Sequence, residues 1–455
     1  MTTAPETTSP HRSFADALLV YFKPRVLIVM FLGFSAGLPL ALSCSTLQIW
    51  STESGVDLGT IGLFTLVGTP YVFKFLWAPL VDGLNAPVLS RLLGHRRGWL
   101  VFAQIMLMAA IVFLSFCNPA VSAWLVAFGA LLVATASATQ DIVIDAFRIE
   151  SLGPDEQAAG MASYVAAYRV GMLVSTAGAL YIVSGFEWLG LAKQAAWSAS
   201  FITMAVLVLI GVATTLIATE PQKSAIADAA HANESSLVSV VNAASGAFTD
   251  FLARDAAIVV LVFVVLYKLC DAFAGAMTAS FVIKIGFSRD DYATIVKGVG
   301  LAATLIGGFY GGVLARAYPM VLCLWIGAIL QMASNLVFTW QAYVGLNYWA
   351  LTATIVVENF TGAIGTVIFV AYLSALCQSP LHTATQYALL TALAAIGRTY
   401  LSAPAGFVAE WTGWPMFFVI SALTAIPSIF VLAWLQQRGH FDTLAKPTRL
   451  TGDDD

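Results

Sequence analysis

The sequence predicts an all-α membrane protein with twelve transmembrane helices in two halves of six. Of its 455 residues, 59% are hydrophobic and only 10% are charged, whereas a soluble domain carries about 25% charged residues. The apolar residues form long runs, and about 20 of them are enough for a helix to cross a bilayer, so a chain of this length holds about a dozen spans. This composition excludes a disordered chain, a nucleic-acid-binding protein and an ordinary soluble enzyme.

Twelve apolar runs follow one another along the chain. The expected spans of the first half are 26–49, 58–81, 99–117, 121–144, 160–182 and 195–218. Those of the second half are 258–283, 292–314, 320–340, 348–376, 383–408 and 415–434. Glycines within them favour close helix packing in lipid. Tryptophans at the span ends predict a belt at the membrane surface: Trp50, Trp99, Trp188, Trp340, Trp349, Trp411 and Trp414.

The basic residues predict the orientation of the chain. With the N-terminus inside, thirteen of the 21 Lys and Arg residues fall in inner loops, three in outer loops and five within spans. Cytoplasmic loops are enriched in Lys and Arg, so we expect both termini in the cytoplasm.

The spans also predict the domain organisation. We expect a cytoplasmic segment at 1–25, a first half at 26–218, a polar, Ala/Ser-rich cytoplasmic linker at 219–255, a second half at 256–436 and a cytoplasmic tail at 437–455. Six helices, a cytoplasmic linker and six more helices are the layout of the major facilitator superfamily.

Charged residues within spans are costly and therefore mark candidate functional sites. Asp141 and Asp145 lie four residues apart on one face of the fourth span, and Arg148 follows one turn later. The group is either a polar wall of a transport cavity, with a carboxylate that takes a proton, or a structural lock between helices. For Asp145 and Arg148 we favour the lock, because a buried pair needs partners rather than turnover. For Gln140 and Asp141, deeper in the span, the two readings stay balanced.

The second half carries its own charged candidates. Lys268 and Asp271 lie one turn apart near the middle of the seventh span, where they either pair with each other or face the cavity. Glu358, beside Asn359 in the tenth span, has no cation close in sequence. It either pairs across helices or stays neutral, which makes it a candidate for proton coupling.

Three further cations lie within spans. Arg169 and Arg398 lie at comparable depths in the fifth and eleventh spans, where a guanidinium fork suits a substrate carboxylate or phosphate. Either arginine can instead neutralise an intramembrane acid. For Lys74 in the second span we favour an ammonium that reaches the inner membrane surface over a ligand-binding role.

The loop after the second span contains Asp82 at its start and the pair Arg96–Arg97 at its end. This arrangement resembles the signature between helices two and three of the major facilitator superfamily, where the acid and the basic residues latch the two halves in one state. The resemblance implies a gating role for Asp82, Arg96 and Arg97. The spacing here is stretched by an insertion, and a positive-inside loop explains the arginines without gating.

The sequence shows no sign of an enzyme, a metal site or a cofactor. It has no phosphate-binding GxxxxGK[ST] loop and no nucleophile–base constellation. The five histidines all fall in segments expected to be cytoplasmic, and the five cysteines are scattered without a CxxC pair. We therefore expect no catalytic residues, no resident cofactor and no metal.

Several stretches together resemble the AmpG muropeptide permeases. They are residues 31–40, 71–79, 96–99, 136–141 with Asp145 and Ala146, and 168–175. The similarity is dense over about residues 23–221 and thinner afterwards, where Glu358–Asn359 and Gly397–Arg398 match best. A related branch of the superfamily moves acetyl-CoA. This chain departs from longer family members, which add two further helices.

The resemblance implies proton-driven import of peptidoglycan fragments across the inner membrane of a Gram-negative bacterium. The cargo would be N-acetylglucosaminyl-1,6-anhydro-N-acetylmuramic acid with or without its peptide, for cell-wall recycling and β-lactamase induction, a route to antibiotic resistance. Alternatives are transport of another anionic cargo, such as acetyl-CoA or a siderophore, and a membrane sensor or scaffold without transport. We expect a monomer whose partners are this small molecule, protons and the bilayer.

Such a cargo needs amide, hydroxyl and cationic partners. Gln140, Arg169, Asn359 and Arg398 are the first candidates for substrate binding, with Ser43, Ser45, Gln48 and Lys268 as secondary ones. A carboxylate that gains and loses a proton between two states would carry the coupling. Our order of preference is Asp141, Asp271 and then Glu358.

Overall fold

The computed structural model describes residues 19–153, 156–221, 256–376 and 383–444. Every regular element in this part of the chain is a helix. The spans of the first half are made from these helices, in chain order: α2 (Pro24–Ala41) with α3 (Leu47–Glu53); α4 (Leu58–Leu63) with α5 (Thr69–Phe73); α8 (His95–Ser115); α9 (Ala123–Ser151); α10 (Gln157–Leu173) with α11 (Ala179–Trp188); and α12 (Lys193–Leu207) with α13 (Leu209–Ile217).

The second half repeats this arrangement. Its spans are α16 (Ala257–Leu266) with α17 (Leu269–Lys284); α18 (Arg289–Asp291) with α19 (Gly300–Ala317); α20 (Met320–Val344); α21 (Tyr348–Leu376); α22 (Thr383–Leu401); and α23 (Ala405–Leu423) with α24 (Ile426–Gln437). Short helices α6 (Ala78–Gly83), α7 (Leu89–Leu93) and α25 (His440–Leu444) lie outside the long spans.

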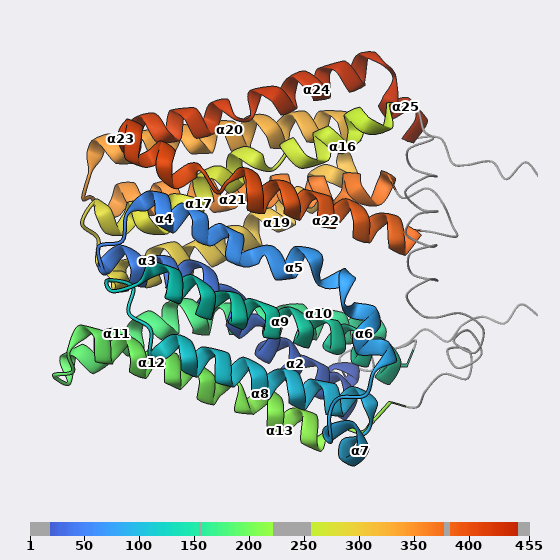
Figure 1. Ribbon diagram of the computed structural model, residues 1–455. Helices are drawn as coiled ribbons and strands as arrows, with labels where there is room; N and C mark the ends of the chain where they lie inside the picture. Colours follow the sequence, from blue (N-terminus) through green and yellow to red (C-terminus); the bar gives the residue numbers. More distant parts are fainter. Residues whose placement is uncertain (1–18, 154–155, 222–255, 377–382, 445–455) are drawn as a thin grey trace, which may run out of the picture.

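Eleven helical segments of the described chain are long and apolar enough to cross a membrane. The twelfth segment is α22, which is less apolar because it carries polar residues and Arg398. The predicted fold class is therefore confirmed, with twelve helices in two halves of six. In Figure 1 the first half forms the lower group and the second half the upper group, and their helices run side by side.

Two predicted spans differ from the observed helices. The second, expected as one helix over 58–81, is a chain of short pieces: α4, the 3₁₀ turns η3 (Phe64–Gly68) and η4 (Lys74–Leu76), and α5 between them. Pro70 and Pro79 each lack a backbone donor, which interrupts the helical hydrogen bonding. The eleventh ends at Leu401 instead of residue 408, because Pro404 precedes a new helix.

Trp188 and Trp50, both predicted to lie in the belt at the membrane surface, differ in their exposure. Trp188 is 86% exposed, as a residue at a span end should be. Trp50 is fully buried, and its ring stacks on that of Trp197 with centroids 5.9 Å apart. The prediction of a surface role for Trp50 was wrong, because α3 continues to Glu53 and carries Trp50 into the helix bundle.

Glycines set the distance between α2 and α10. A Cβ on Gly33 or Gly37 would collide with the backbone carbonyls of Tyr164 and Tyr168, and a Cβ on Gly171 with that of Phe34. The two helices therefore touch backbone to backbone, as small residues permit in membranes. This contact fixes the position of α10, and with it two tyrosines of the candidate site.

We predict that Gly37→Ala lowers the apparent melting temperature of the detergent-solubilised protein. The added methyl group must push α10 away, and overpacking of this kind costs about 1–3 kcal/mol. Gly185→Ala is the matched control, since nothing lies within 4 Å of a Cβ at that position. Thermal unfolding followed by intrinsic fluorescence measures both variants. Equal melting temperatures for the two variants would contradict the close contact.

Candidate functional site

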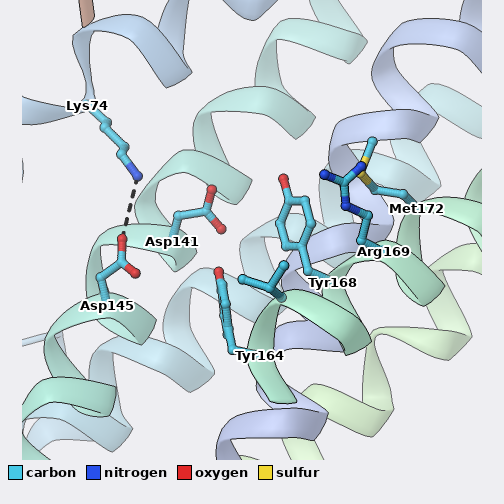
Figure 2. Close-up of a pocket in the computed structure, with 8 residues that line it drawn as sticks. Lys74, Asp141, Asp145, Tyr164, Tyr168, Arg169 and Met172 are labelled. Carbon is cyan, nitrogen blue, oxygen red and sulfur yellow. Dashed lines mark ion pairs between the residues drawn. The ribbon is translucent and has the colours of Figure 1, made fainter. Parts of the chain in front are cut away.

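A cavity of about 420 Å³ opens between α9, α10 and the irregular second span. It is lined by two acids, two cations, two tyrosines and two apolar side chains: Asp141, Asp145, Lys74, Arg169, Tyr164, Tyr168, Val165 and Met172. Figure 2 shows the polar side chains converging on one space from these three elements. Concave sites of this size with a few converging polar groups are the usual form of ligand sites.

The α9 helix places its two acids one turn apart on the cavity wall. Asp145 lies between two cations: Lys74 Nζ is 3.7 Å from its Oδ2, and Arg148 Nη2 is 3.7 Å from its Oδ1. Lys74 thus turns into the cavity instead of following the expected path to the membrane surface. Both ion pairs are longer than a hydrogen bond, so neither is tight.

Asp141 differs from Asp145 in its surroundings. It is 8% exposed, and its buried Oδ1 has no hydrogen-bond partner. Its neighbour Gln140 is fully buried with both side-chain polar atoms unpartnered, and it is not part of the cavity lining. Buried polar atoms without partners are costly, and sites where they occur need an explanation. Asp141 thus lines the cavity, whereas the side chain of Gln140 is buried among the helices outside it.

The α10 helix contributes five side chains to the cavity, of which only Arg169 was predicted from the sequence as a site residue. Tyr164 and Tyr168 lie four residues apart, with ring centroids 6.0 Å apart and planes at 35°. The Arg148 guanidinium carbon lies 5.9 Å from the Tyr164 ring centroid, a cation–π distance. Their spacing of four residues places both tyrosines on the same helix face, and Tyr168 directly precedes Arg169. Tyrosines are too common on membrane helices for this spacing alone to identify a binding site.

In the second half, Lys268 and Asp271 pair with each other. Lys268 Nζ lies 2.6 Å from Asp271 Oδ2 and donates to Thr366 Oγ1 at 3.1 Å. The seventh span is interrupted at this point, since α16 ends at Leu266 and α17 begins at Leu269. Broken membrane helices recur at transport sites because the break frees backbone groups.

Glu358 and Asn359 lie on α21, and Asn359 contacts α19. Asn359 Nδ2 donates to Glu358 Oε2 at 2.5 Å, and Thr304 donates to Asn359 Oδ1 at 3.1 Å. Gly300 leaves room for the amide, because a Cβ there would lie 3.2 Å from Asn359 Nδ2. The side chain of Glu358 therefore has a neutral partner from its own helix.

Of the secondary candidates of the first span, Ser43 and Ser45 lie in a stretch of wider, π-helical turns, η2 (Leu42–Thr46), and Gln48 follows in α3. Ser43 donates to the backbone oxygen of Pro39 at 2.9 Å, and Gln48 is buried. Ser45 contacts the second half, since it accepts a hydrogen bond from Lys297 Nζ at 3.1 Å. Arg398 is exposed on α22, close to Thr399, whose backbone oxygen accepts from Thr65 of the second span at 3.3 Å. Among Ser43, Ser45 and Gln48, Ser45 is the one with a side-chain hydrogen bond to the second half among the described residues.

The predicted gating loop makes contacts inside the first half. Arg96 Nη2 lies 2.6 Å from Glu150 Oε1 at the end of α9. Arg97 donates to the backbone oxygens of Thr215 and Leu216 on α13, at 3.0 and 2.7 Å. These bonds tie α8 to α9 and α13. The side chain of Asp82 lies outside the described residues.

One group of polar contacts between the halves lies at the opposite end of the bundle from this loop, the left end in Figure 1. Arg289 links two acids of the first half, with Nε 3.0 Å from Glu53 Oε1 and Nη2 3.0 Å from Glu187 Oε2. Arg289 and Glu53 are only 13% and 10% exposed. Thr52 and Ser280 meet beside them with Oγ atoms 3.0 Å apart. We call Arg289, Glu53, Glu187, Thr52 and Ser280 the closing cluster.

The closing cluster was not predicted from the sequence. Arg289 was expected to be an outer-loop cation, and no motif connects this residue with Glu53 or Glu187. Only the fold brings these acids to a shared guanidinium.

The chain matches known proteins along most of its length. The model of the Major Facilitator Superfamily matches residues 29–401. The anhydromuropeptide permease of Escherichia coli (strain K12) is 38% identical over 421 residues, which cover 92% of this chain and 81% of the relative. The putative transporter AmpG 4 of Rickettsia felis is 33% identical over 416 residues, which cover 91% of this chain and 97% of the relative.

Solved structures share the fold at low sequence identity. The nucleoside transporter NupG superposes with a TM-score of 0.66 at 11% identity, covering 91% of this chain and 99% of NupG. A D-xylose–proton symporter superposes with a TM-score of 0.63 at 14% identity, covering 90% of this chain and 97% of the symporter.

We predict that a chain with Thr52→Cys and Ser280→Cys forms a disulfide under mild oxidation, because the two side chains meet in the closing cluster. Adding Arg289→Met should slow this reaction about tenfold, the effect of ~1.4 kcal/mol, since Glu53 and Glu187 then lose their shared cation. Mobility on non-reducing gels measures the reaction, with each single cysteine variant as control. Equal rates with and without Arg289 would contradict its closing role.

Proposed function

The chain belongs to the Major Facilitator Superfamily, in the branch of the AmpG muropeptide permeases, and we propose that it imports anhydromuropeptides across the bacterial inner membrane. It is a multi-pass membrane transporter, with homologues named as permeases. The cargo in this proposal is N-acetylglucosaminyl-1,6-anhydro-N-acetylmuramic acid and its peptides. Their import serves cell-wall recycling, and the fragments can signal induction of a β-lactamase.

One observation carries the proposal: the identity of 38% to the anhydromuropeptide permease of E. coli extends over 92% of this chain. A match of that extent includes both halves and the elements that line the cavity. Similarity confined to one half would support only the fold, because transporters of unrelated cargoes share this architecture.

The chemistry of the cavity supports such a cargo. A muropeptide is polar, carries carboxylates and has two sugar rings. Arg169 offers a guanidinium fork for a carboxylate, and the tyrosine pair offers apolar faces with hydroxyl groups at the edge. A cavity of about 420 Å³ suits one part of this molecule, so the rest would extend toward the second half.

The intramembrane acids support coupling to the proton gradient. A carboxyl group in low-dielectric surroundings exchanges protons when its access to water or to a cation changes between two states. Asp141 is our first choice as the carrier because its Oδ1 lacks a partner. Asp271 and Glu358 come next, since Asp271 already forms an ion pair with Lys268 and Glu358 already accepts a hydrogen bond from Asn359.

We further propose that both termini and the 219–255 linker lie in the cytoplasm and that the protein works as a monomer. In this orientation the closing cluster lies on the outer side, so it would shut the cavity from the periplasm while cargo leaves toward the cytoplasm. The excess of Lys and Arg in the loops on the side of the termini supports this orientation, because cytoplasmic loops are enriched in basic residues.

We expect membrane vesicles containing this protein to accumulate labelled anhydromuropeptide when a proton gradient is imposed, and not when it is dissipated. Right-side-out and inverted vesicles give the direction. Competition with acetyl-CoA, oligopeptides and a siderophore gives the selectivity. Binding without uptake would favour a sensor, and displacement by one of the competitors would name a different cargo; either outcome would overturn the proposal.

We predict that Asp141→Asn lowers gradient-driven uptake at least about tenfold but leaves exchange of cargo within about twofold. A carrier that cannot release a proton still alternates when cargo is bound on both sides. Glu156→Gln is the matched control, because this carboxyl group pairs with Lys23 outside the long spans. Gradient-driven uptake at the unchanged rate in Asp141→Asn would remove this residue as the carrier.

A further inference from the structure

We propose that Lys74 is an exchangeable counter-ion that pairs with Asp145 while Asp141 is protonated and moves to Asp141 when that proton leaves. The inference rests on the proposed proton coupling and adds the residue that links the proton to the helices. Its basis is the geometry of three charged side chains around one cavity, two acids from α9 and Lys74 from the second span (Figure 2).

The two acids have an unequal supply of cations. Asp145 has two, Lys74 and Arg148, each at 3.7 Å. Asp141 has no ion pair within the described part of the chain, and its Oδ1 is buried without a partner. An ionised carboxylate in such surroundings needs a cation, since an unpaired buried charge costs several kcal/mol. The distribution seen here therefore suits a protonated Asp141.

Lys74 is the cation best placed to move. Asp141 and Asp145 are one helical turn apart, about 6 Å along the axis at 1.5 Å per residue, and both face the segment that carries Lys74. The ammonium group lies at the end of a flexible four-carbon chain. Its side chain is 35% exposed and that of Asp145 is 44% exposed, so breaking their pair costs little. Arg148 remains with Asp145 after the exchange.

The other groups around Asp141 do not replace Lys74. Tyr71 on α5 carries a hydroxyl group, and so do Tyr164 and Tyr168, which line the cavity from α10; none of the three supplies a positive charge. Arg169 lines the same cavity from the far side of Tyr168, as Figure 2 shows. That position leaves Arg169 for the cargo.

The position of Lys74 connects the exchange to the second half. Lys74 begins η4, directly after α5, and α5 packs against α22. Thr69 Oγ1 and Tyr400 Oη lie 3.0 Å apart, and the rings of Phe73 and Tyr400 have centroids 6.5 Å apart. On the other side, Trp77 Nε1 donates to Thr139 on α9 at 3.2 Å. A pull on Lys74 therefore acts on a short, irregular segment held between α9 and α22.

The test is the proton occupancy of Asp141 in the purified full chain reconstituted in lipid. Infrared absorption of the protonated carboxyl group, assigned by its loss in Asp141→Asn, is followed against pH. Lys74→Met removes the cation that stabilises the ionised form, so the band should persist to a pH at least about one unit higher. Asp145→Asn leaves Lys74 free for Asp141, so the band should vanish at a lower pH. Lys74→Arg should stay near the unchanged chain.

Lys23→Met is the matched control. Lys23 pairs with Glu156 at 2.8 Å outside the long spans, so its removal should leave the band unchanged. A merely structural role for Lys74 predicts shifts in one direction for both Lys74→Met and Asp145→Asn, or none, and either result overturns the exchange. Size-exclusion profiles and melting temperatures identify variants that fail to fold, in which case Lys74→Gln replaces Lys74→Met.

Vesicle uptake separates this inference from the proposed function. Lys74→Met should lose gradient-driven accumulation about tenfold and keep exchange within about twofold. If the unchanged chain transports no muropeptide while the infrared shifts occur, the cargo is wrong and the exchange stands. If the unchanged chain accumulates muropeptide without a proton gradient, Lys74 has no role in proton coupling.

Discussion

A charge moved from water into the interior of a membrane protein must find a partner, because the desolvation of a single ion costs several kcal/mol. The described structure meets this constraint differently in each half. In the second half, Lys268 and Asp271 form a tight pair at 2.6 Å where the seventh span breaks. In the first half, Asp145 draws two cations to 3.7 Å, and Asp141 has none. This difference makes the first cavity the place where a proton changes the charge balance.

Backbone geometry decides where those charges stand. The glycine contacts of α2 with α10 allow no side chain between the two helices, so Tyr164, Tyr168 and Arg169 are held at a fixed depth. The second span does the opposite, because its prolines divide it into short pieces that follow their neighbours. The closely packed α10 and the irregular second span thus face each other across the cavity. A fixed helix positions the groups that bind a ligand, and an irregular segment can change its backbone geometry between two states.

Fold class was predictable because bilayer thickness and backbone hydrogen bonding leave a long apolar run few options other than a helix. Single residues were predictable where local spacing decided the contact. Lys268 and Asp271 pair as their one-turn spacing allowed. Lys74 was placed at the membrane surface because its path depends on the break of the second span. Trp50 was assigned to the surface belt because helix length, which buries it, has no local signal.

Contacts between residues distant in sequence escaped prediction altogether. Glu53, Glu187 and Arg289 lie at the ends of three different helices, α3, α11 and α18, and no pattern in a single chain relates them. Charge counting even assigned Arg289 to an outer loop, where a solvated cation needs no partner. The fold gives it two carboxylates and leaves its side chain only 13% exposed, so the desolvation penalty makes the pairing matter.

The closing cluster and the cavity charges have a common logic. At both places one cation serves more than one carboxylate: Arg289 bridges Glu53 and Glu187, and Lys74 lies within reach of Asp145 and Asp141. A planar guanidinium holds two acids at once through separate nitrogens, which suits a contact that either forms or breaks as a unit. A single ammonium on a flexible stem contacts one acid well at a time, which suits exchange. The choice of Arg at the closing cluster and Lys in the cavity therefore matches a latch between rigid halves and a movable counter-ion within one of them.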